Sequence, residues 1–243
     1  MSESLMREAW EVRQSTMSML PGISREQDWK NFSLATSRMH TFFSARTPNR
    51  ELIATAFLTV YEGEIEAKSY RCFLMSYTYI KPNQHNALFA LWLTVALARR
   101  LLTLDLRPLY MFSTCHLSSF LTTSIFTVGT NDRYTLQESN PQSFEHKLML
   151  KMAKRENGAN FDPNTGLAKT YMLPVNSTIR PIRWSPLSPS LTLYLRLNSG
   201  WLDGTILPVM FRLKRWKLPL YLGNRCCFHI NRKIYQWRKS LFS

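Results

Sequence analysis

The sequence predicts an α/β (α+β) fold in which a mixed, twisted sheet is flanked by helices. Two runs, at residues 52–61 and 70–80, are rich in β-branched and aromatic residues, which is typical of strands. A long apolar segment then separates them from a short apolar run at 109–113, so residues 52–126 follow the order β-β-α-β-α. The 243 residues are 45% hydrophobic and 13% aromatic, which excludes a disordered chain.

The first 50 residues are expected to be mainly helical. Residues 2–20 combine helix-forming residues with a loose amphipathic pattern, and Pro21-Gly22 ends that pattern. A second helix is expected at 25–43, before the turn Thr47-Pro48-Asn49.

Residues 51–130 are expected to form the β-β-α-β-α core of the domain. The polar connection at 62–69 is suited to an antiparallel hairpin, and Lys81-Pro82-Asn83 ends its second strand. A helix at 87–104, the strand at 109–113 and a further helix starting near 116–118 follow. A strand, helix and strand this close together favour a right-handed crossover and hence a parallel or mixed sheet.

Residues 131–243 are expected to complete the same single domain, 1–243. Ser143 is a suitable N-cap for a helix at 142–156, and a turn-rich loop follows at 157–166. Prolines predict an irregular segment at 170–190, and two strands are expected at 191–197 and 206–213.

The charge is strongly positive and unevenly distributed. The chain has 31 Lys and Arg against 16 Asp and Glu, a net charge of +15. Residues 201–243 hold nine of the basic and one of the acidic residues, interleaved with aromatic residues such as Trp216 and Trp237. This pattern favours an acidic partner: nucleic acid, anionic membrane, a phosphorylated cofactor or an acidic protein. A solvated charged face whose aromatic side chains pack inward is an equally good interpretation.

No metal or disulfide site is expected. The four cysteines have no C-x-x-C spacing, and the five histidines lie in separate segments. The first 20 residues lack the apolar core of a signal peptide, and the most apolar segment, 87–98, is shorter than the about 20 residues that span a bilayer. We therefore expect a cytoplasmic protein that is soluble or at most peripheral to a membrane.

The segment 70–126 resembles the central part of the GNAT acyltransferase superfamily. It has a strand ending in Tyr79-Ile80-Lys81-Pro82, a polar turn, a long apolar helix, a strand and a second helix. The family's phosphate-binding turn is usually R/Q-x-x-G-x-G/A; here Gln84 matches, while Ala87 and Phe89 stand at the glycine positions. The run Phe161-Asp162-Pro163-Asn164-Thr165-Gly166 is similar to motifs of uncharacterised bacterial proteins with a GNAT-like core, or is simply a turn. The resemblance favours a bacterial source.

The resemblance implies a donor site at a strand that splays from its neighbour. The pantetheine arm of an acyl thioester would bond to that strand, and its phosphates would meet the following helix N-terminus. The residues expected at the donor are Tyr79, Ile80, Gln84, His85, Asn86, Ala87 and Leu88. No cofactor would be bound permanently. The donor would be acyl-CoA or the phosphopantetheine of an acyl carrier protein, and the missing glycines and basic surface favour the carrier protein.

Acyl transfer to an amine needs a base, an acid and a polarised carbonyl. His116 is the expected base because its ordinary pKa lies near neutrality, with Glu62 and Glu64 as acidic alternatives. Tyr110 or Tyr79 could reprotonate the thiolate, and Cys115 is either an acyl-carrying nucleophile or a buried thiol. The residues expected near the substrate are Tyr77, Ser113, Cys115 and Ser118. Residues 131–243 are expected to form the acceptor side and the basic C-terminal part of the domain.

Two functions follow from the sequence. The first is an acyltransferase, for fatty acyl or other acyl groups, that acts on an amine of a small molecule, lipid or peptide. The alternative is a non-catalytic basic protein that binds nucleic acid or an anionic membrane surface through residues 201–243.

Overall fold

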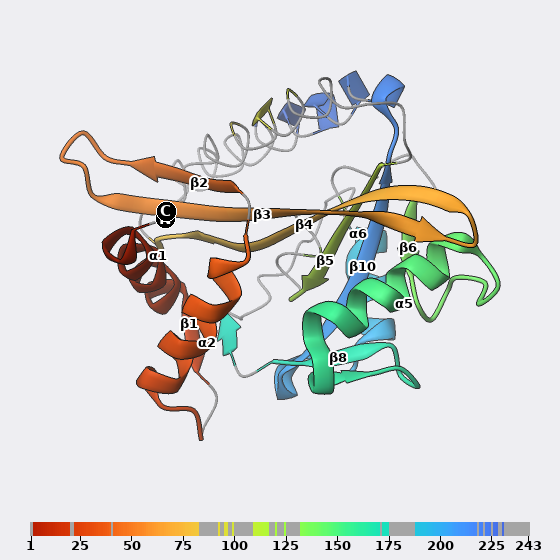
Figure 1. Cartoon of the computed structure of the whole chain (residues 1–243), viewed down its shortest axis with the longest axis horizontal. Helices are drawn as coiled ribbons and strands as arrows, with labels where there is room; N and C mark the ends of the chain where they lie inside the picture. The colour runs from red at the N-terminus through yellow and green to blue at the C-terminus, as the bar shows by residue number, and fades with distance from the viewer. Residues whose placement is uncertain are drawn as a thin grey trace, which may run out of the picture.

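The structure is a computed structural model. It describes residues 2–19, 22–39, 41–82, 109–116, 132–170, 172–174 and 188–217, together with single positions within 92–99, 120–124 and 219–230. Figure 1 shows a large sheet with helices packed against it.

The sheet has the strand order β2-β3-β4-β5-β10-β8-β7, and β6 also pairs with β10. Its strands are β2 (Thr41–Arg46), β3 (Leu52–Ile65), β4 (Lys68–Ile80), β5 (Leu109–Cys115), β6 (Arg133–Thr135), β7 (Phe161–Asp162), β8 (Leu167–Lys169) and β10 (Thr205–Leu213). The ladder between β4 and β5 is parallel, whereas β3, β4 and β10 pair with their other neighbours in antiparallel fashion. A separate antiparallel ladder joins β1 (Met17–Met19) to β9 (Met172–Pro174). The predicted mixed α/β sheet flanked by helices is confirmed.

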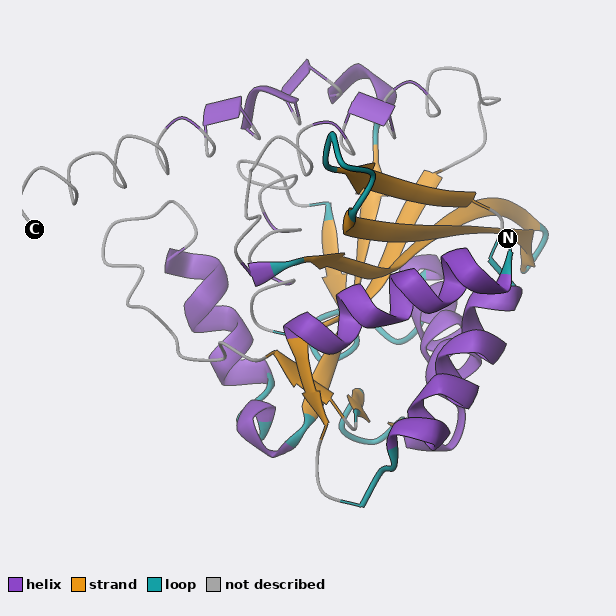
Figure 2. Cartoon of the chain, turned by 90° about the vertical axis from the view of Figure 1, so that its left-hand side faces the viewer, coloured by secondary structure: helices purple, strands orange, loops and turns teal. Residues whose placement is uncertain are grey.

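The helices cover both faces of the sheet (Figure 2). They are α1 (Glu3–Thr16), α2 (Arg25–Ser37), α5 (Phe144–Asn157) and α6 (Ser188–Leu197). In β5, Tyr110 and Phe112 belong to the core cluster that contains α5, whereas Met111 and Cys115 belong to the cluster that contains α6. The alternation of a strand therefore places α5 and α6 on opposite faces.

The pair α1–α2 lies on the same face as α5. In β3, Phe57 packs in the α1–α2 cluster and Tyr61 packs against the α5 cluster. Residues four apart in a regular strand point to the same side, so the α1–α2 pair and α5 share one face.

The hairpin of β3 and β4 is longer than the sequence predicted. The strands pair from Ala54↔Ile80 to Ile65↔Lys68, so most of the expected connection at 62–69 is strand. The turn consists of Glu66 and Ala67, whose φ values of 51° and 60° are left-handed. Two consecutive left-handed residues are typical of the tight turns that join twisted antiparallel strands.

Three predictions of secondary structure were wrong. Residues 17–19, expected to continue the first helix, form β1. Residues 191–197, expected as a strand, belong to α6, because Ser190, Leu193, Tyr194 and Asn198 are buried at helical spacing. The second N-terminal helix ends at Ser37, and residues 41–43 begin β2, which pairs with β3. The helix at 142–156, capped by Ser143, and the strand at 206–213 are found as α5 and β10.

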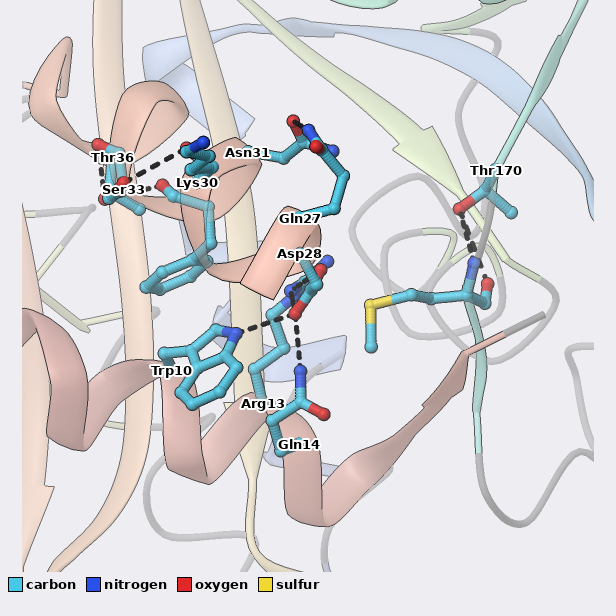
Figure 3. A network of polar contacts seen from close by, with 12 residues as sticks. Trp10, Arg13, Gln14, Gln27, Asp28, Lys30, Asn31, Ser33, Thr36 and Thr170 are labelled. Carbon is cyan, nitrogen blue, oxygen red and sulfur yellow. Dashed lines mark hydrogen bonds and ion pairs between the residues drawn. The ribbon is translucent and has the colours of Figure 1, made fainter. Parts of the chain in front are cut away.

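A buried polar network joins α1 to α2 (Figure 3). Asp28 is fully buried, and its carboxylate accepts hydrogen bonds from Trp10 Nε1 at 2.6 Å, Arg13 at 2.5 and 2.6 Å, and Gln14 Nε2 at 2.5 Å. A buried carboxylate needs a charged partner and several donors, and the α1 face supplies both. The network therefore holds α1 and α2 against each other.

Candidate functional site

Strands β4 and β5 diverge in the middle of the sheet. Their ladder runs from Arg71↔Leu109 to Leu74↔Phe112 and ends there. Beyond it, β4 stays paired with β3 as far as Ile80, and β5 stays paired with β10 as far as Cys115. We call the two diverging arms, residues 75–80 and 113–115, the fork; Figure 1 shows β4 and β5 separating.

Met75 occupies the start of the fork on the α6 face. Its side chain packs against the α6 cluster, against the cluster of Ala54 and Ala56, and against the cluster of Leu58 and Phe73. A thioether chain adapts well to such an irregular junction.

The C-terminal ends of α2 and α5 approach the two arms from the opposite face. Ser76 of β4 contacts Met39, just after α2, with 3.8 Å between Oγ and Sδ. Asn157, the last residue of α5, donates from Nδ2 to Thr114 Oγ1 of β5 at 3.4 Å. Two helix ends therefore meet the fork on the face that α1, α2 and α5 share.

Glu156 is an ionisable group on that face, one residue before the Asn157 that contacts the β5 arm. It is half-buried and lies close enough to the Tyr61 hydroxyl of β3 for each group to shift the pKa of the other. Burial raises the pKa of Glu156, although the nearby Tyr61 hydroxyl and the charges of Arg155 and Arg38 act in the opposite direction. A half-buried carboxylate with a raised pKa is typical of a general base.

Tyr61 links Glu156 to the sheet. Burial, followed by the nearby Glu156, raises the pKa of Tyr61 to about 12, so its hydroxyl stays protonated and can donate to the carboxylate. The Arg155 guanidinium lies 3.9 Å from the centre of the Tyr61 ring. Glu156 was not among the predicted site residues, because β3 and the end of α5 are distant in sequence and no local pattern marks their contact.

His116 directly follows β5, at the end of one arm. Burial lowers its pKa from 6.5 to about 4, so the imidazole is neutral near pH 7. The preceding residue is anchored by α6, since the Tyr194 hydroxyl donates to the Cys115 carbonyl at 3.1 Å. Asn198 donates to the same hydroxyl at 3.1 Å and to the Thr205 carbonyl at 3.0 Å. This buried network fixes the backbone that carries His116.

Tyr110 lies at the other end of α5. Its hydroxyl donates to Glu145 Oε1 at 3.1 Å, and burial raises its pKa well above the usual range. Glu145 is in the first turn of α5 and Glu156 in the last, about 16 Å apart along the helix axis. The structure therefore does not bring the Tyr110 hydroxyl together with the fork.

The two hairpin glutamates also lie away from the fork. Glu62 forms an ion pair with Arg71 at 2.6 Å, and Glu64 accepts a hydrogen bond from Ser69 at 3.2 Å. Because Glu62 neighbours Tyr61 in β3, it points to the opposite face from Tyr61 and Glu156.

The remaining predicted residues divide into two groups. Tyr79 and Ile80 lie on the β4 arm, where Tyr79 packs toward α1 and α2 and Ile80 toward Ala54. Ser113 and Cys115 are buried on the β5 arm, and Cys115 belongs to the α6 cluster. The side chain of Tyr77 lies outside what the structure describes, as do Gln84, His85, Asn86, Ala87, Leu88 and Ser118.

The run 161–166 forms a turn between β7 and β8. Asp162 accepts hydrogen bonds from the Asn164 backbone and the Thr165 hydroxyl, both at 2.9 Å. Gly166 has a left-handed φ of 69°. Both the turn and the motif interpretation of this run are compatible with that geometry.

Part of the basic C-terminal region is ion-paired. Lys214 and Lys217 contact Asp132 at 2.5 and 2.6 Å. Burial opposes ionisation of Asp132, but its hydrogen bonds to both lysines prevail and lower its pKa. Trp216 between them is 75% exposed. The later residues Arg232, Lys233, Tyr235, Trp237, Arg238 and Lys239 lie outside the described residues.

Within the described ranges, no cluster of three or more His, Cys, Asp or Glu side chains could hold a metal ion. The helices in the same ranges include none with the length and apolar character needed to cross a bilayer.

Comparisons with known proteins add little. No protein-family model matches the chain, and no curated protein matches it. Among solved structures, it is similar to a conserved protein of unknown function from Enterococcus faecalis V583, described as a probable N-acyltransferase. The TM-score is 0.38 with 9% identity, and the match covers 65% of this chain but only 42% of that one. A likeness of this size establishes neither family nor activity; the sheet and its fork are the findings on which function must rest.

Proposed function

We propose that the protein transfers an acyl group from an acyl thioester to an amine, with the donor lying in the fork. The observation that carries the proposal is the end of the β4–β5 ladder at Leu74↔Phe112, while both strands keep their outer partners. The amide groups of a pantetheine arm can bond to strand backbone as an added strand does. The resemblance of residues 70–126 to the GNAT superfamily implies the same donor position.

Glu156 is the proposed base. The amine nitrogen attacks the thioester carbonyl carbon, the C–S bond breaks, and an amide and a thiolate result; the thiolate takes a proton from water to become the thiol. The proton that the amine loses passes to the Glu156 carboxylate, whose half-buried position favours uptake. The partial negative charges at the C-terminal ends of α2 and α5 favour an incoming ammonium group.

His116 is proposed as a hydrogen-bond donor rather than a base. With a pKa of about 4 it stays neutral near pH 7 and accepts a proton weakly. A neutral imidazole at the end of the β5 arm can donate to the thioester carbonyl oxygen or to the departing sulfur. An assay that compares acyl-CoA with acyl carrier protein donors decides which of them delivers the thioester.

The test is an acyl-transfer assay with acetyl-CoA, long-chain acyl-CoA and acyl carrier protein donors against a panel of amines. Product is followed by mass spectrometry, and thiol release is measured independently. Glu156→Gln should lower kcat at least about 100-fold, as expected for loss of a general base, with little change in KM for the donor.

Glu64→Gln is the matched control, because Glu64 is an exposed carboxylate on the hairpin. Its kcat and its KM for the donor should equal those of the unaltered protein. No transfer from any donor to any amine would refute the proposal, and full activity of Glu156→Gln would refute the role of Glu156.

A second function rests on the exposed Trp216, next to Lys217, whose ammonium lies 5.1 Å from the ring centre. An exposed aromatic side chain beside cations suits nucleic acid or an anionic membrane surface. Binding to RNA, DNA and anionic vesicles at rising salt tests it, since phosphate-driven affinity must fall steeply. Salt-independent binding, or none, would exclude this second function.

A further inference from the structure

Two arginines flank Glu156 at the fork. Arg155 precedes it on α5 and holds its guanidinium 3.9 Å from the Tyr61 ring centre. Arg38 caps the C-terminal end of α2 and lies close enough for its charge to act on Glu156. Both arginines are exposed, whereas Glu156 is half-buried.

This charge pattern disfavours a simple amine. An amine without other charges arrives as an ammonium ion and meets the exposed guanidinium groups as well as the less exposed carboxylate. Like charges repel, and the repulsion is strongest where water is partly excluded. The attraction of Glu156 is thus opposed by Arg38 and Arg155.

A substrate that carries an oxyanion close to its ammonium group satisfies all three side chains. The planar guanidinium matches carboxylate and phosphate oxygens with paired hydrogen bonds. The stacking of Arg155 on Tyr61 holds that guanidinium in place before the substrate arrives, which lowers the entropy cost of binding. The ammonium group then faces Glu156 and the carbonyl ends of α2 and α5.

We infer that the acceptor is a zwitterion with an oxyanion near its amine, in which Arg38 and Arg155 bind the oxyanion and Glu156 receives the amine proton. Amino acids and aminoalkyl phosphates share this chemistry. The inference rests on the proposed function and names its class of acceptor.

The first test uses the unaltered protein and one acyl donor with matched acceptor pairs. Phenylalanine is compared with phenethylamine, leucine with isopentylamine, and O-phosphoethanolamine with ethanolamine. We expect the zwitterion of at least one pair to have at least about tenfold higher kcat/KM, which corresponds to about 1.4 kcal/mol. The amino acid pairs and the phosphate pair together show which oxyanion is preferred.

The second test uses variants. Arg38→Gln and Arg155→Gln should each raise KM for the zwitterion about tenfold and change kcat little. KM for the matched amine that lacks the oxyanion should stay unchanged or fall. The matched controls are Lys30→Gln on α2 and Lys154→Gln on α5, which are exposed cations on the same two helices. They should leave both KM values unchanged.

The outcomes separate the two proposals. No transfer to either member of any pair would refute the acyltransferase function itself. Transfer with equal kcat/KM for amine and zwitterion would overturn the zwitterion inference and leave the acyltransferase in place. An equal rise of KM for both members in the arginine variants would assign these residues to general packing and would also overturn it.

Discussion

Acidification should destabilise the protein through His116. In the folded protein its pKa is lowered by burial from 6.5 to about 4. Between these two pH values the unfolded chain binds a proton that the folded chain does not. The free energy of unfolding must therefore fall as the pH falls through this window, and His116 contributes no pH dependence well above pH 6.5.

The size of the effect follows from the two pKa values. The difference between 6.5 and about 4, at about 1.4 kcal/mol per pH unit, amounts to about 3 kcal/mol. That is a large part of the about 5–15 kcal/mol by which domains are usually stable.

Urea unfolding at intervals between pH 4 and pH 8 measures the effect, with His116→Gln as the comparison. Glutamine keeps a hydrogen-bonding side chain and does not titrate. Other acid-sensitive groups, such as Asp132 with its lowered pKa, are common to both proteins and cancel in the difference. The stability of the unaltered protein relative to His116→Gln should fall by about 3 kcal/mol from pH 7 to pH 4. Parallel curves would refute the reasoning, because they would mean that the folded protein protonates His116 freely.

Three further predictions concern stability and are measured by urea unfolding at pH 7. Asp28→Asn should cost about 3–5 kcal/mol, because the Arg13 guanidinium loses its buried counter-charge; a loss below 1 kcal/mol would mean that the network is solvated. Tyr194→Phe should cost about 1–2 kcal/mol through the lost hydrogen bond to the Cys115 carbonyl, and an unchanged midpoint would contradict the role of α6 as an anchor. Ala67→Gly should stabilise by up to about 1 kcal/mol, because glycine adopts the left-handed turn without strain; destabilisation would argue against that turn geometry.

The core of the sheet could be predicted because its signals are local. The strands at 52–61, 70–80, 109–113 and 206–213 are dense in β-branched, aromatic and aliphatic residues, and all four are found. The N-terminal serines Ser2 and Ser24 cap α1 and α2 by accepting hydrogen bonds from Leu5 and Gln27. Signals of this kind do not depend on the rest of the molecule.

The segment 191–197 shows where local signals conflict. Leucines at 191, 193, 195 and 197 alternate with other residues, and that period of two predicts a strand. The structure instead buries Tyr194 and Asn198, whose hydroxyl and amide find partners at Cys115 and Thr205. Those partners lie in β5 and β10, so only tertiary packing decides between the helix and the strand.

The candidate site was predictable only in part. The positions of β4 and β5 follow from the sequence, and so does His116 at the end of β5. Glu156 does not, because its environment is created by Tyr61 from β3 and Arg38 from α2. In the sequence alone, a carboxylate at the end of an amphipathic helix cannot be distinguished from a fully solvated one.

The position of β10 in the sheet governs the order in which the molecule can fold. Leu109 of β5 pairs with Leu213, and Cys115 pairs with Leu207, so the intervening chain must be looped out before the ladder closes. The hairpin of β3 and β4, by contrast, closes through a two-residue turn and can form early. Until β10 arrives, one edge of β5 has no strand beside it and can pair with another chain. Refolding yield should therefore depend on protein concentration, with aggregation competing with closure of the β5–β10 ladder.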